Sequence, residues 1–178
     1  RLARYLTLEL APGGDVRGAL GRLPGAVDPA ATVVGLGRSV VLALGRDLPG
    51  LRDFPARAGA GFEVPSTPAA LWCWLRGDDR GELVHRTRAI EAAVAPALRT
   101  VAILDAFQYE ASRDLTGYED GTENPTGADA AAAAVLQGAG PGLDGSSFVA
   151  VQQWLHDLDR FARLPQAEQD ATFGRRRE

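Results

Sequence analysis

Alternating apolar and polar residues mark three segments of the chain as half-buried β-strands. In residues 5–10 the leucines fall on one face of an extended chain, and residues 70–76 repeat this alternation. Residues 101–110 form the third and longest such segment. A short apolar run rich in β-branched residues, 31–35, predicts a further strand. Residues 39–44 fit either a short helix or another strand, because their length cannot decide between the two.

Two segments carry the spacing of an amphipathic helix. Asp15 suits an N-cap, and apolar residues follow it at helical intervals as far as Leu23. Asp79 followed by Glu82 fits a capping box, and a helix is expected from there to about Pro96. The predicted buried stripe of this second helix consists of Leu83, Thr87, Ile90 and Val94.

The resulting element order, βαββαβ, predicts an α+β fold of the ferredoxin-like kind. In this fold an antiparallel sheet carries two helices on one face. We expect it to occupy residues 1–115. A turn-rich loop and a glycine-rich linker follow over residues 116–145. Residues 146–178 then predict a strand over 147–154 and two short helices. This last part either joins the first domain or begins a second one.

Composition and charge narrow the class of protein. The chain has 178 residues, of which 46% are hydrophobic and 24% charged, as in an ordinary globular protein. A net charge of −4 argues against general binding of nucleic acid. The single cysteine, Cys73, excludes an intrachain disulfide framework. There is no apolar run of about 20 residues, so we expect no membrane span, and no signal-like start, so we expect a cytoplasmic chain.

A cluster of carboxylates and glycines lies between Gly117 and Pro125. Asp-Gly and Asn-Pro pairs are strong turn signals, so a plain tight turn is one interpretation. The other is a rigid loop that brings the backbone close to a ligand and directs one carboxylate at it. Gly117 and Gly121 would allow that approach. A carboxylate next to a cofactor can act as a proton shuttle.

Two motifs in this part of the chain resemble a known family. Residues Gly117-Tyr118-Glu119-Asp120-Gly121-Thr122-Glu123-Asn124-Pro125 resemble the GxxDG signature of the dye-decolorizing (DyP-type) heme peroxidases, in the fuller form G-[FY]-x-D-G-T-x-N-P. The segment from Gly145 to Leu158 resembles the family's strand and its W-x-H-D-L motif. Asp78-Asp79-Arg80, before the second predicted helix, is similar too. The resemblance covers essentially the whole chain.

This resemblance implies a cofactor, a reaction and a set of site residues. The family binds heme b between two ferredoxin-like halves, reduces hydrogen peroxide and oxidises dyes, phenols or other organic electron donors. Asp120 matches the distal aspartate, which takes a proton from the peroxide and passes it to the leaving oxygen. Gly121, Thr122 and Glu123 match loop residues that lie against the heme. Family members commonly form homo-oligomers, and some are packed into a protein nanocompartment shell.

The chain also departs from the family pattern. The family's proximal histidine and distal arginine lie downstream of the W-x-H-D-L motif, beyond residue 178. The resemblance therefore implies that residues 146–178 begin a truncated second ferredoxin-like domain. Neither His85 nor His156 matches the iron ligand, so we expect no metal ligand in this chain. The alternative function is a catalytically incomplete ferredoxin-like module for dimerisation or heme handling.

Overall fold

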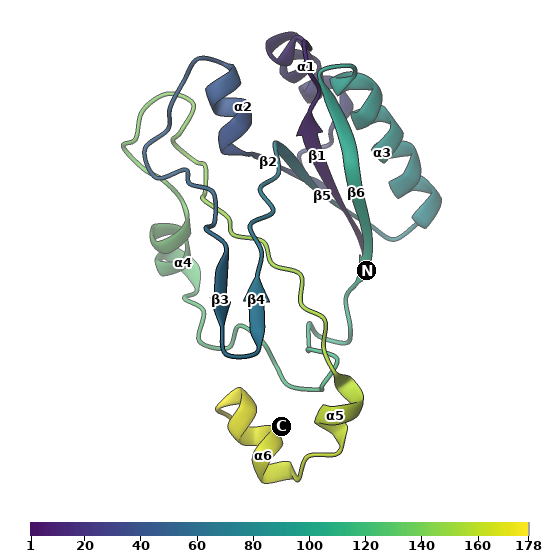
Figure 1. Ribbon diagram of the computed structural model, residues 1–178, viewed down its shortest axis with the longest axis vertical. Coiled ribbons are helices and arrows are strands. Elements are labelled where there is room, and N and C mark those ends of the chain that lie inside the picture. The colour runs from purple at the N-terminus through teal and green to yellow at the C-terminus, as the bar shows by residue number, and fades with distance from the viewer. Residues whose placement is uncertain (178) are drawn as a thin grey trace. The chain divides into compact units, whose positions relative to one another are not determined.

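Residues 1–177 are described by the structure, a computed structural model, and they fall into two compact units. The first spans Arg1–Phe107 and the second begins at Gln108. The first unit contains a four-stranded antiparallel sheet (Figure 1). Its strands run in the order β2-β5-β1-β6 and comprise β1 (Leu2–Leu10), β2 (Thr32–Leu36), β5 (Leu71–Gly77) and β6 (Leu98–Phe107).

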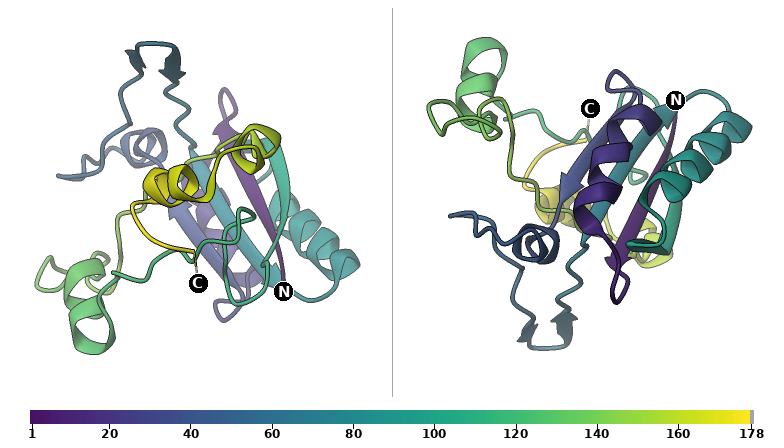
Figure 2. Two further views of the ribbon diagram at one scale, coloured as in Figure 1. Left: turned by 90° about the horizontal axis from the view of Figure 1, so that it is seen from below. Right: turned by 90° about the horizontal axis from the view of Figure 1, so that it is seen from above.

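Two helices complete the predicted ferredoxin-like arrangement. Helix α1 (Val16–Arg22) connects β1 to β2 through the 3-10 turn η1 (Leu23–Ala26), and α3 (Arg80–Val94) connects β5 to β6. Both helices lie on the same face of the sheet (Figure 2). The βαββαβ order and the α+β fold class are therefore confirmed.

The core of this unit lies between the sheet and the two helices. The alternating leucines of β1 and β5 point into it, because every second side chain of a strand faces the same side. They meet the stripe of α3 that the sequence predicted. The residues buried here are Leu6, Leu8, Ala19, Leu23, Val40, Ala70, Leu71, Cys73, Leu75, Leu83, Ile90, Val94, Ala97 and Leu98.

Both predicted helix caps are present. The carboxylate of Asp15 accepts a hydrogen bond from the Gly18 amide at 2.9 Å. In the same way Asp79 accepts one from the Glu82 amide at 2.8 Å. Each carboxylate satisfies an amide in the first turn of its helix, where no helical carbonyl is available.

The opposite face of the sheet carries an aromatic cluster. The ring of Tyr5 stacks on Trp72 and Trp74, with centroids 5.7 and 6.0 Å away. The guanidinium of Arg76 lies 5.1 Å from the Trp74 ring, within the range of a cation–π contact. These side chains alternate with the core leucines, so the two faces of the sheet have distinct compositions.

The connection between β2 and β5 departs from the sequence prediction. Within residues 39–44, which fitted either a helix or a strand, residues 39–43 belong to helix α2 (Arg38–Ala43). A two-stranded hairpin of β3 (Arg57–Gly59) and β4 (Phe62–Val64) lies in a stretch expected to be loop. Both strands are three residues long and largely exposed, so they leave little alternation for a sequence pattern to register.

Strand β6 is also placed earlier than predicted. It begins at Leu98 and ends at Phe107, where residues 101–110 were expected. Tyr109 therefore lies beyond the strand. A register shift opposite Thr7 and Leu8 interrupts the regular pairing with β1 and disturbs the simple alternation on which the prediction depended.

The second unit contains three short helices: α4 (Gly127–Ala134), α5 (Leu158–Ala162) and α6 (Gln166–Phe173). Helices α5 and α6 confirm the two short helices predicted near the end of the sequence, whereas α4 lies in a stretch expected to be loop and linker. The ring of Tyr118 is buried against Phe161 and Phe173. No helix in the described part of the chain combines the length and apolar character needed to cross a bilayer.

The strand predicted over residues 147–154 is wrong for this structure. These residues adopt no regular secondary structure, and their apolar side chains, among them Phe148, Val151 and Trp154, are exposed. A β-strand is fixed by backbone hydrogen bonds to a neighbouring strand. Within residues 108–177 no other strand is present to provide them.

Candidate functional site

The loop that carries Asp120 follows β6 and precedes α4. Its first half is closed by an isolated antiparallel bridge between Arg113 and Glu119. Within this bridge the Asp114 amide donates to the Tyr118 carbonyl at 2.9 Å, and the Gly117 amide donates to the Asp114 carbonyl at 2.8 Å. The backbone therefore forms a narrow hairpin-like turn that places Asp120 directly after its second arm.

Asp114 stabilises the beginning of this turn. Its Oδ1 accepts hydrogen bonds from the Thr116 amide at 2.8 Å and the Thr116 hydroxyl at 2.7 Å. Partial burial opposes ionisation of Asp114, but these two bonds and the nearby His156 hold the pKa of its carboxyl below the ordinary value. The carboxylate thus acts as a fixed acceptor within the loop.

Gly121 gives the second half of the loop its shape. Its φ of +72° lies in the left-handed region, which favours glycine. A Cβ at this position would lie 2.8 Å from the side-chain nitrogen of Asn124. The Asn124 amide donates to the Gly121 carbonyl at 3.0 Å and closes a tight turn. A tight turn is therefore present within residues 117–125 as predicted, but it is centred on Thr122 and Glu123 and not on the Asp120–Gly121 pair.

The carboxylate of Asp120 lies at the surface of this loop. Asp120 is exposed, and its Oδ1 accepts a hydrogen bond from the Gly121 amide at 2.7 Å. This bond orients the side chain against its own backbone. A carboxylate held in this way can accept a proton from a small molecule and return it.

The three predicted cofactor-binding residues follow Asp120 directly. Gly121, Thr122 and Glu123 are all exposed, so the loop presents one continuous edge from Asp120 to Glu123. The Thr122 hydroxyl accepts a hydrogen bond from Arg175 at 2.5 Å. Sequence and structure thus bring the four predicted site residues together in one turn.

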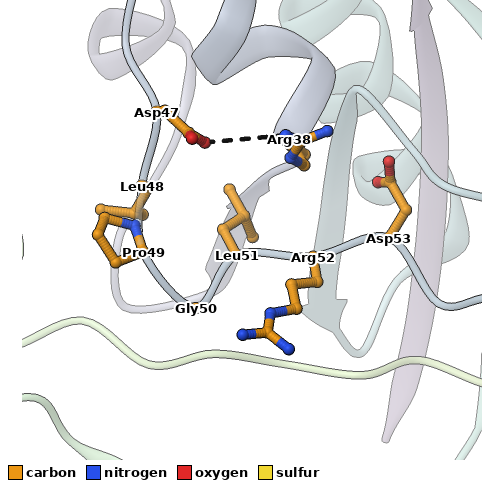
Figure 3. A pocket seen from close by; sticks show the side chains of 8 residues that line it. All are labelled: Arg38, Asp47, Leu48, Pro49, Gly50, Leu51, Arg52 and Asp53. Atoms are coloured by element: carbon orange, nitrogen blue, oxygen red, sulfur yellow. Dashed lines mark ion pairs between the residues drawn. The ribbon is translucent and has the colours of Figure 1, made fainter.

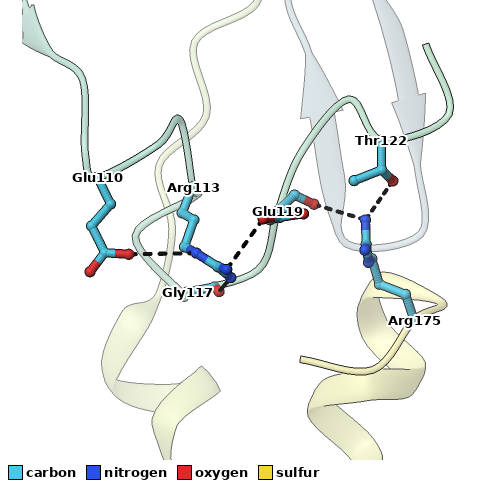
Figure 4. Close-up of polar contacts among 6 residues, drawn as sticks. All are labelled: Glu110, Arg113, Gly117, Glu119, Thr122 and Arg175. Carbon is cyan, nitrogen blue, oxygen red and sulfur yellow. Dashed lines mark hydrogen bonds and ion pairs between the residues drawn. The ribbon is translucent and has the colours of Figure 1, made fainter. Parts of the chain in front are cut away.

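Two arginines contact this loop, and neither was predicted from the sequence to belong to the site. Nη1 of Arg113 donates to the Gly117 carbonyl at 2.9 Å, and its Nη2 lies 3.2 Å from a carboxylate oxygen of Glu119 (Figure 4). Nη1 of Arg175 donates to the Glu119 carbonyl at 3.4 Å as well as to Thr122 (Figure 4). The only available signal for Arg113 was that it is the one basic residue in an acidic stretch.

The sequence indicated Tyr118 only as one residue of the motif. In the structure it is the most deeply buried residue of the loop, with 1% of its surface exposed. Its ring stacks on Phe173 with centroids 4.2 Å apart. Its hydroxyl donates to Asp170 Oδ1 at 2.6 Å and accepts from Gln166 at 3.0 Å. The loop is therefore fixed to helix α6 through this side chain.

Neither histidine is grouped with other metal-ligating residues. His85 is an exposed residue of α3 outside its buried stripe. Nε2 of His156 lies 3.8 Å from Asp114 Oδ2, which makes it an ion-pair partner when it is protonated. Among residues 1–177 no set of three or more His, Cys, Asp or Glu side chains is placed to hold a metal ion.

A hollow in the first unit is lined by residues of the α2–β3 connection (Figure 3). Arg38 forms an ion pair with Asp47 at 3.9 Å across it, and Arg52 and Asp53 lie on its edge. Charges of both signs line this hollow, and none of its residues was predicted to be functional. The Asp120 loop, with its exposed carboxylate, is the better candidate site.

Comparison with known proteins supports the family resemblance that the motif at residues 117–125 indicates. Residues 111–178 match a family model described as "Dyp-type peroxidase, C-terminal". A dye-decolorizing peroxidase from Rhodococcus erythropolis is 33% identical over 125 residues, which are 70% of this chain and 37% of that protein. A dye-decolorizing peroxidase from Mycobacterium tuberculosis is 30% identical over the same shares of the two chains.

Solved structures extend the similarity to nearly the full length of the chain. A putative DyP-type peroxidase from Shewanella oneidensis gives a TM-score of 0.88 at 25% identity, covering 99% of this chain and 62% of that one. DyPB from Rhodococcus jostii gives 0.84 at 29% identity, covering 99% of this chain and 61% of that one, and a variant of it was solved in complex with heme. The chain thus spans 34–37% of the length of its curated relatives and about three fifths of these structures.

Proposed function

Because the chain belongs to the dye-decolorizing (DyP-type) peroxidase family, we propose that the protein containing it is a heme-dependent peroxidase. It reduces hydrogen peroxide and oxidises dyes, phenols or similar organic donors. The observation that carries this proposal is the exposed carboxylate of Asp120 on a loop whose residues 117–125 follow the family motif and are fixed on both sides.

The residues of this loop suit one face of a heme b group. Gly121 adopts a left-handed backbone, and this conformation presents the exposed main chain next to Asp120, where a flat ligand could contact it. Thr122 and Glu123 are exposed next to it and supply polar atoms at the rim. When bound, the heme supplies the iron and the redox equivalents for reduction of peroxide.

Asp120 is the proton carrier in this proposal. Its carboxylate accepts the proton from one oxygen of hydrogen peroxide and delivers it to the other oxygen, which leaves as water. The same proton is moved between two atoms of one substrate, so the carboxylate returns to its starting state. The hydrogen bond from the Gly121 amide keeps one carboxylate oxygen oriented during both transfers.

Further groups complete the site in this proposal. A bound heme would need a protein ligand to its iron, and an arginine would assist the reaction with peroxide. We propose that both come from the part of the family fold that this chain does not span. The exposed apolar segment at residues 147–154 would then pair with strands of that same part.

The experiment that tests the function uses the complete, heme-loaded protein. We expect a Soret band and peroxide-dependent bleaching of an anthraquinone dye. Replacing Asp120 by Asn is expected to lower the rate constant for peroxide by about 10²- to 10⁴-fold, the usual range for loss of a general acid–base. Asp129→Asn is the matched control, because Asp129 is an exposed carboxylate on α4.

Two results would contradict different parts of the proposal. A heme-loaded protein without peroxide-dependent oxidation of dyes or phenols is not a peroxidase. If activity is present but Asp120→Asn and Asp129→Asn behave alike, the peroxidase function stands and the role of Asp120 does not.

A second candidate function is favoured by exposed apolar side chains. Phe148, Val149, Val151, Trp154 and Leu155 are all exposed in one segment. A ferredoxin-like module for dimerisation or heme handling would cover such a segment with a partner. Hemin binding with no peroxide turnover in the complete protein would support this second function.

The family also supports proposals about partners and location. We propose a cytoplasmic homo-oligomer, and packing inside a protein nanocompartment shell is an extension of the same idea. Light scattering on the native protein measures the oligomeric state. Copurification of the native protein with large shell particles would test the packing.

A further inference from the structure

Arg175 contacts the Asp120 loop on both sides of Asp120. Its Nη1 donates to the carbonyl of Glu119, the residue before Asp120, and to the hydroxyl of Thr122, two residues after it. One guanidinium nitrogen therefore bridges the residues on either side of the Asp120–Gly121 pair (Figure 4).

The backbone of Arg175 is itself held in place. Helix α6 ends at Phe173, and Gly174 adopts a left-handed conformation with φ of +71°. This reversal lets the Arg175 amide donate to the Asp170 carbonyl at 3.1 Å, a common way to close a helix C-terminus. The side chain of Arg175 thus extends from a fixed point.

Helix α6 is anchored to the loop at a second place. The ring of Phe173 stacks on Tyr118, and Asp170 accepts a hydrogen bond from the Tyr118 hydroxyl. Tyr118, two residues before Asp120, is therefore held by the C-terminal end of α6. Arg175, just beyond that end, contacts Glu119 before Asp120 and Thr122 after it. Residues 120–124 are all exposed, so the contacts of Arg175 hold a segment that lies outside the buried Tyr118 cluster.

Arg113 holds the loop from the other arm. It donates to the Gly117 carbonyl and lies against the Glu119 carboxylate, with 21% of its side chain exposed. Glu119 is thus held through its carboxylate by Arg113 and through its carbonyl by Arg175. Asp120 follows it immediately in the chain.

We propose that Arg175 is a positioning residue for Asp120, acting through the Glu119 carbonyl and the Thr122 hydroxyl to fix residues 119–122, which lead into the tight turn 121–124. This inference rests on the proposed peroxidase function for its catalytic consequence. Without the bridge the turn samples other conformations, and the carboxylate spends less time in the orientation needed for proton transfer. Small displacements of a reacting group reduce rates strongly.

The first test measures the loop itself, in the complete protein without heme. Amide hydrogen exchange of the peptide covering residues 117–125 is followed by mass spectrometry. We expect roughly 10-fold faster exchange in Arg175→Gln than in the parent, because the turn opens locally more often. Arg163→Gln is the control, since Arg163 is an exposed arginine at the end of α5.

A pair of variants at Thr122 isolates the hydroxyl. Thr122→Ser keeps the acceptor and is expected to exchange like the parent. Thr122→Val has a similar shape without the acceptor and is expected to resemble Arg175→Gln. If Arg175→Gln exchanges no faster than Arg163→Gln, the proposal is overturned, whether or not the protein is a peroxidase.

The second test measures the consequence in the heme-loaded protein. The rate constant for reaction with hydrogen peroxide is expected to fall about 10- to 100-fold in Arg175→Gln, while the KM for the donor and the Soret band stay unchanged. Arg175→Lys retains a cationic donor, so its rate constant for hydrogen peroxide is expected to lie between those of the parent and Arg175→Gln. If the rate constants for reaction with peroxide and for oxidation of the donor fall equally and the heme content is lower, Arg175 is a heme-binding or folding residue. This result would overturn the positioning role.

The two tests separate the two proposals. If the parent protein reacts with no peroxide at all, the peroxidase function fails. The exchange measurement then decides by itself whether Arg175 fixes the turn around Asp120.

Discussion

The hydroxyl of Tyr118 donates a hydrogen bond of 2.6 Å to the carboxylate of Asp170, which lies 52 residues further along the chain. Gln166 donates to both of these side chains, at 3.0 Å to the hydroxyl and at 2.7 Å to the carboxylate. One aromatic residue of the motif thus connects the Asp120 loop to helix α6. Any change in this connection is expected to reach Asp120.

The Tyr118–Asp170 pair predicts a loss of stability at alkaline pH. Burial of the phenol and its hydrogen bond to Asp170 raise the pKa of Tyr118 above its ordinary value of about 10. Because the native pKa is raised, the contribution of the Tyr118–Asp170 pair to stability is complete below about pH 10. This contribution is lost as the pH rises through the native pKa of Tyr118. Urea unfolding monitored from pH 8 to 11.5 should show this loss in the parent and not in Tyr118→Phe.

The same pair makes the opposite prediction in acid. The hydrogen bonds from Tyr118 and Gln166 lower the pKa of Asp170, so its contribution is present above about pH 4 and is lost as the pH falls through the lower native pKa. Tyr109→Phe is the control, because Tyr109 is an exposed tyrosine outside the cluster. Identical pH profiles for the parent and Tyr118→Phe would show that the pair contributes nothing to stability.

Gly121→Ala should destabilise the loop and also disturb the candidate site. A non-glycine residue at φ of +72° costs about 1–2 kcal/mol. The added Cβ would also displace the Asn124 side chain, which lies 2.8 Å from its position. We therefore expect a lower rate constant for peroxide together with lower stability. Urea unfolding and stopped-flow kinetics measure the two effects.

Gly127→Ala separates these two effects. Gly127 has φ of +57°, but no atom lies within 4 Å of a Cβ built there. This control should lose a similar amount of stability and keep its reaction with peroxide. If both variants keep full activity, the turn at Gly121 does not position Asp120.

The framework of the first unit was predictable because its elements carry periodic patterns. Leu6 and Leu8, or Leu83 and Ile90, repeat at the intervals of a strand and a helix, and Asp79 marks where the helix begins. Asp120 and its neighbours were identified from a contiguous motif, which can be recognised in a single sequence. These features depend on residues that are close together in the chain.

The supports of the loop were not predictable in this way. Arg175 reaches the loop from a position more than 50 residues away, and a run of three arginines such as residues 175–177 is usually solvated. Asp170 likewise resembles an ordinary exposed helix residue. The strand predicted at 147–154 failed for a related reason, since apolar alternation gives the propensity of a strand but not its hydrogen-bonding partner.

The N-cap of α3 offers a local test of the first unit. Asp79→Ala removes the acceptor for the Glu82 amide and should reduce the free energy of unfolding by about 1 kcal/mol. Asp79→Asn should lose much less, because asparagine is an equally good cap. Asp78→Ala is the matched control, since Asp78 is exposed and precedes the cap. Equal losses for Asp78→Ala and Asp79→Ala would indicate a general charge effect at the helix N-terminus, not a cap.

Two ion pairs that join β1 to β6 should differ in strength because they differ in burial. Arg4 and Asp105 are directly opposite each other and form two hydrogen bonds of 2.6 and 2.8 Å, with 14% of the Arg4 side chain exposed. Glu9 and Arg99 form a single bond of 2.8 Å, and both side chains are more than half exposed. Asp105→Asn should cost about 0.5–1 kcal/mol, since Asp105 itself is half exposed and screened. Glu9→Gln should cost no more than about 0.3 kcal/mol.

The pH dependence of the first pair gives this prediction its sharpest form. The hydrogen bond from Arg4 lowers the pKa of Asp105, so the stabilisation is present above about pH 4 and is lost as the pH falls through the lower native pKa. The difference in unfolding free energy between the parent and Asp105→Asn should therefore be full at pH 7 and shrink below pH 4. Urea titrations at pH 7, 5 and 3 measure it. A difference that stays constant over this range would mean that Asp105 contributes through packing or strand pairing, because an ion pair must weaken when its carboxylate is protonated.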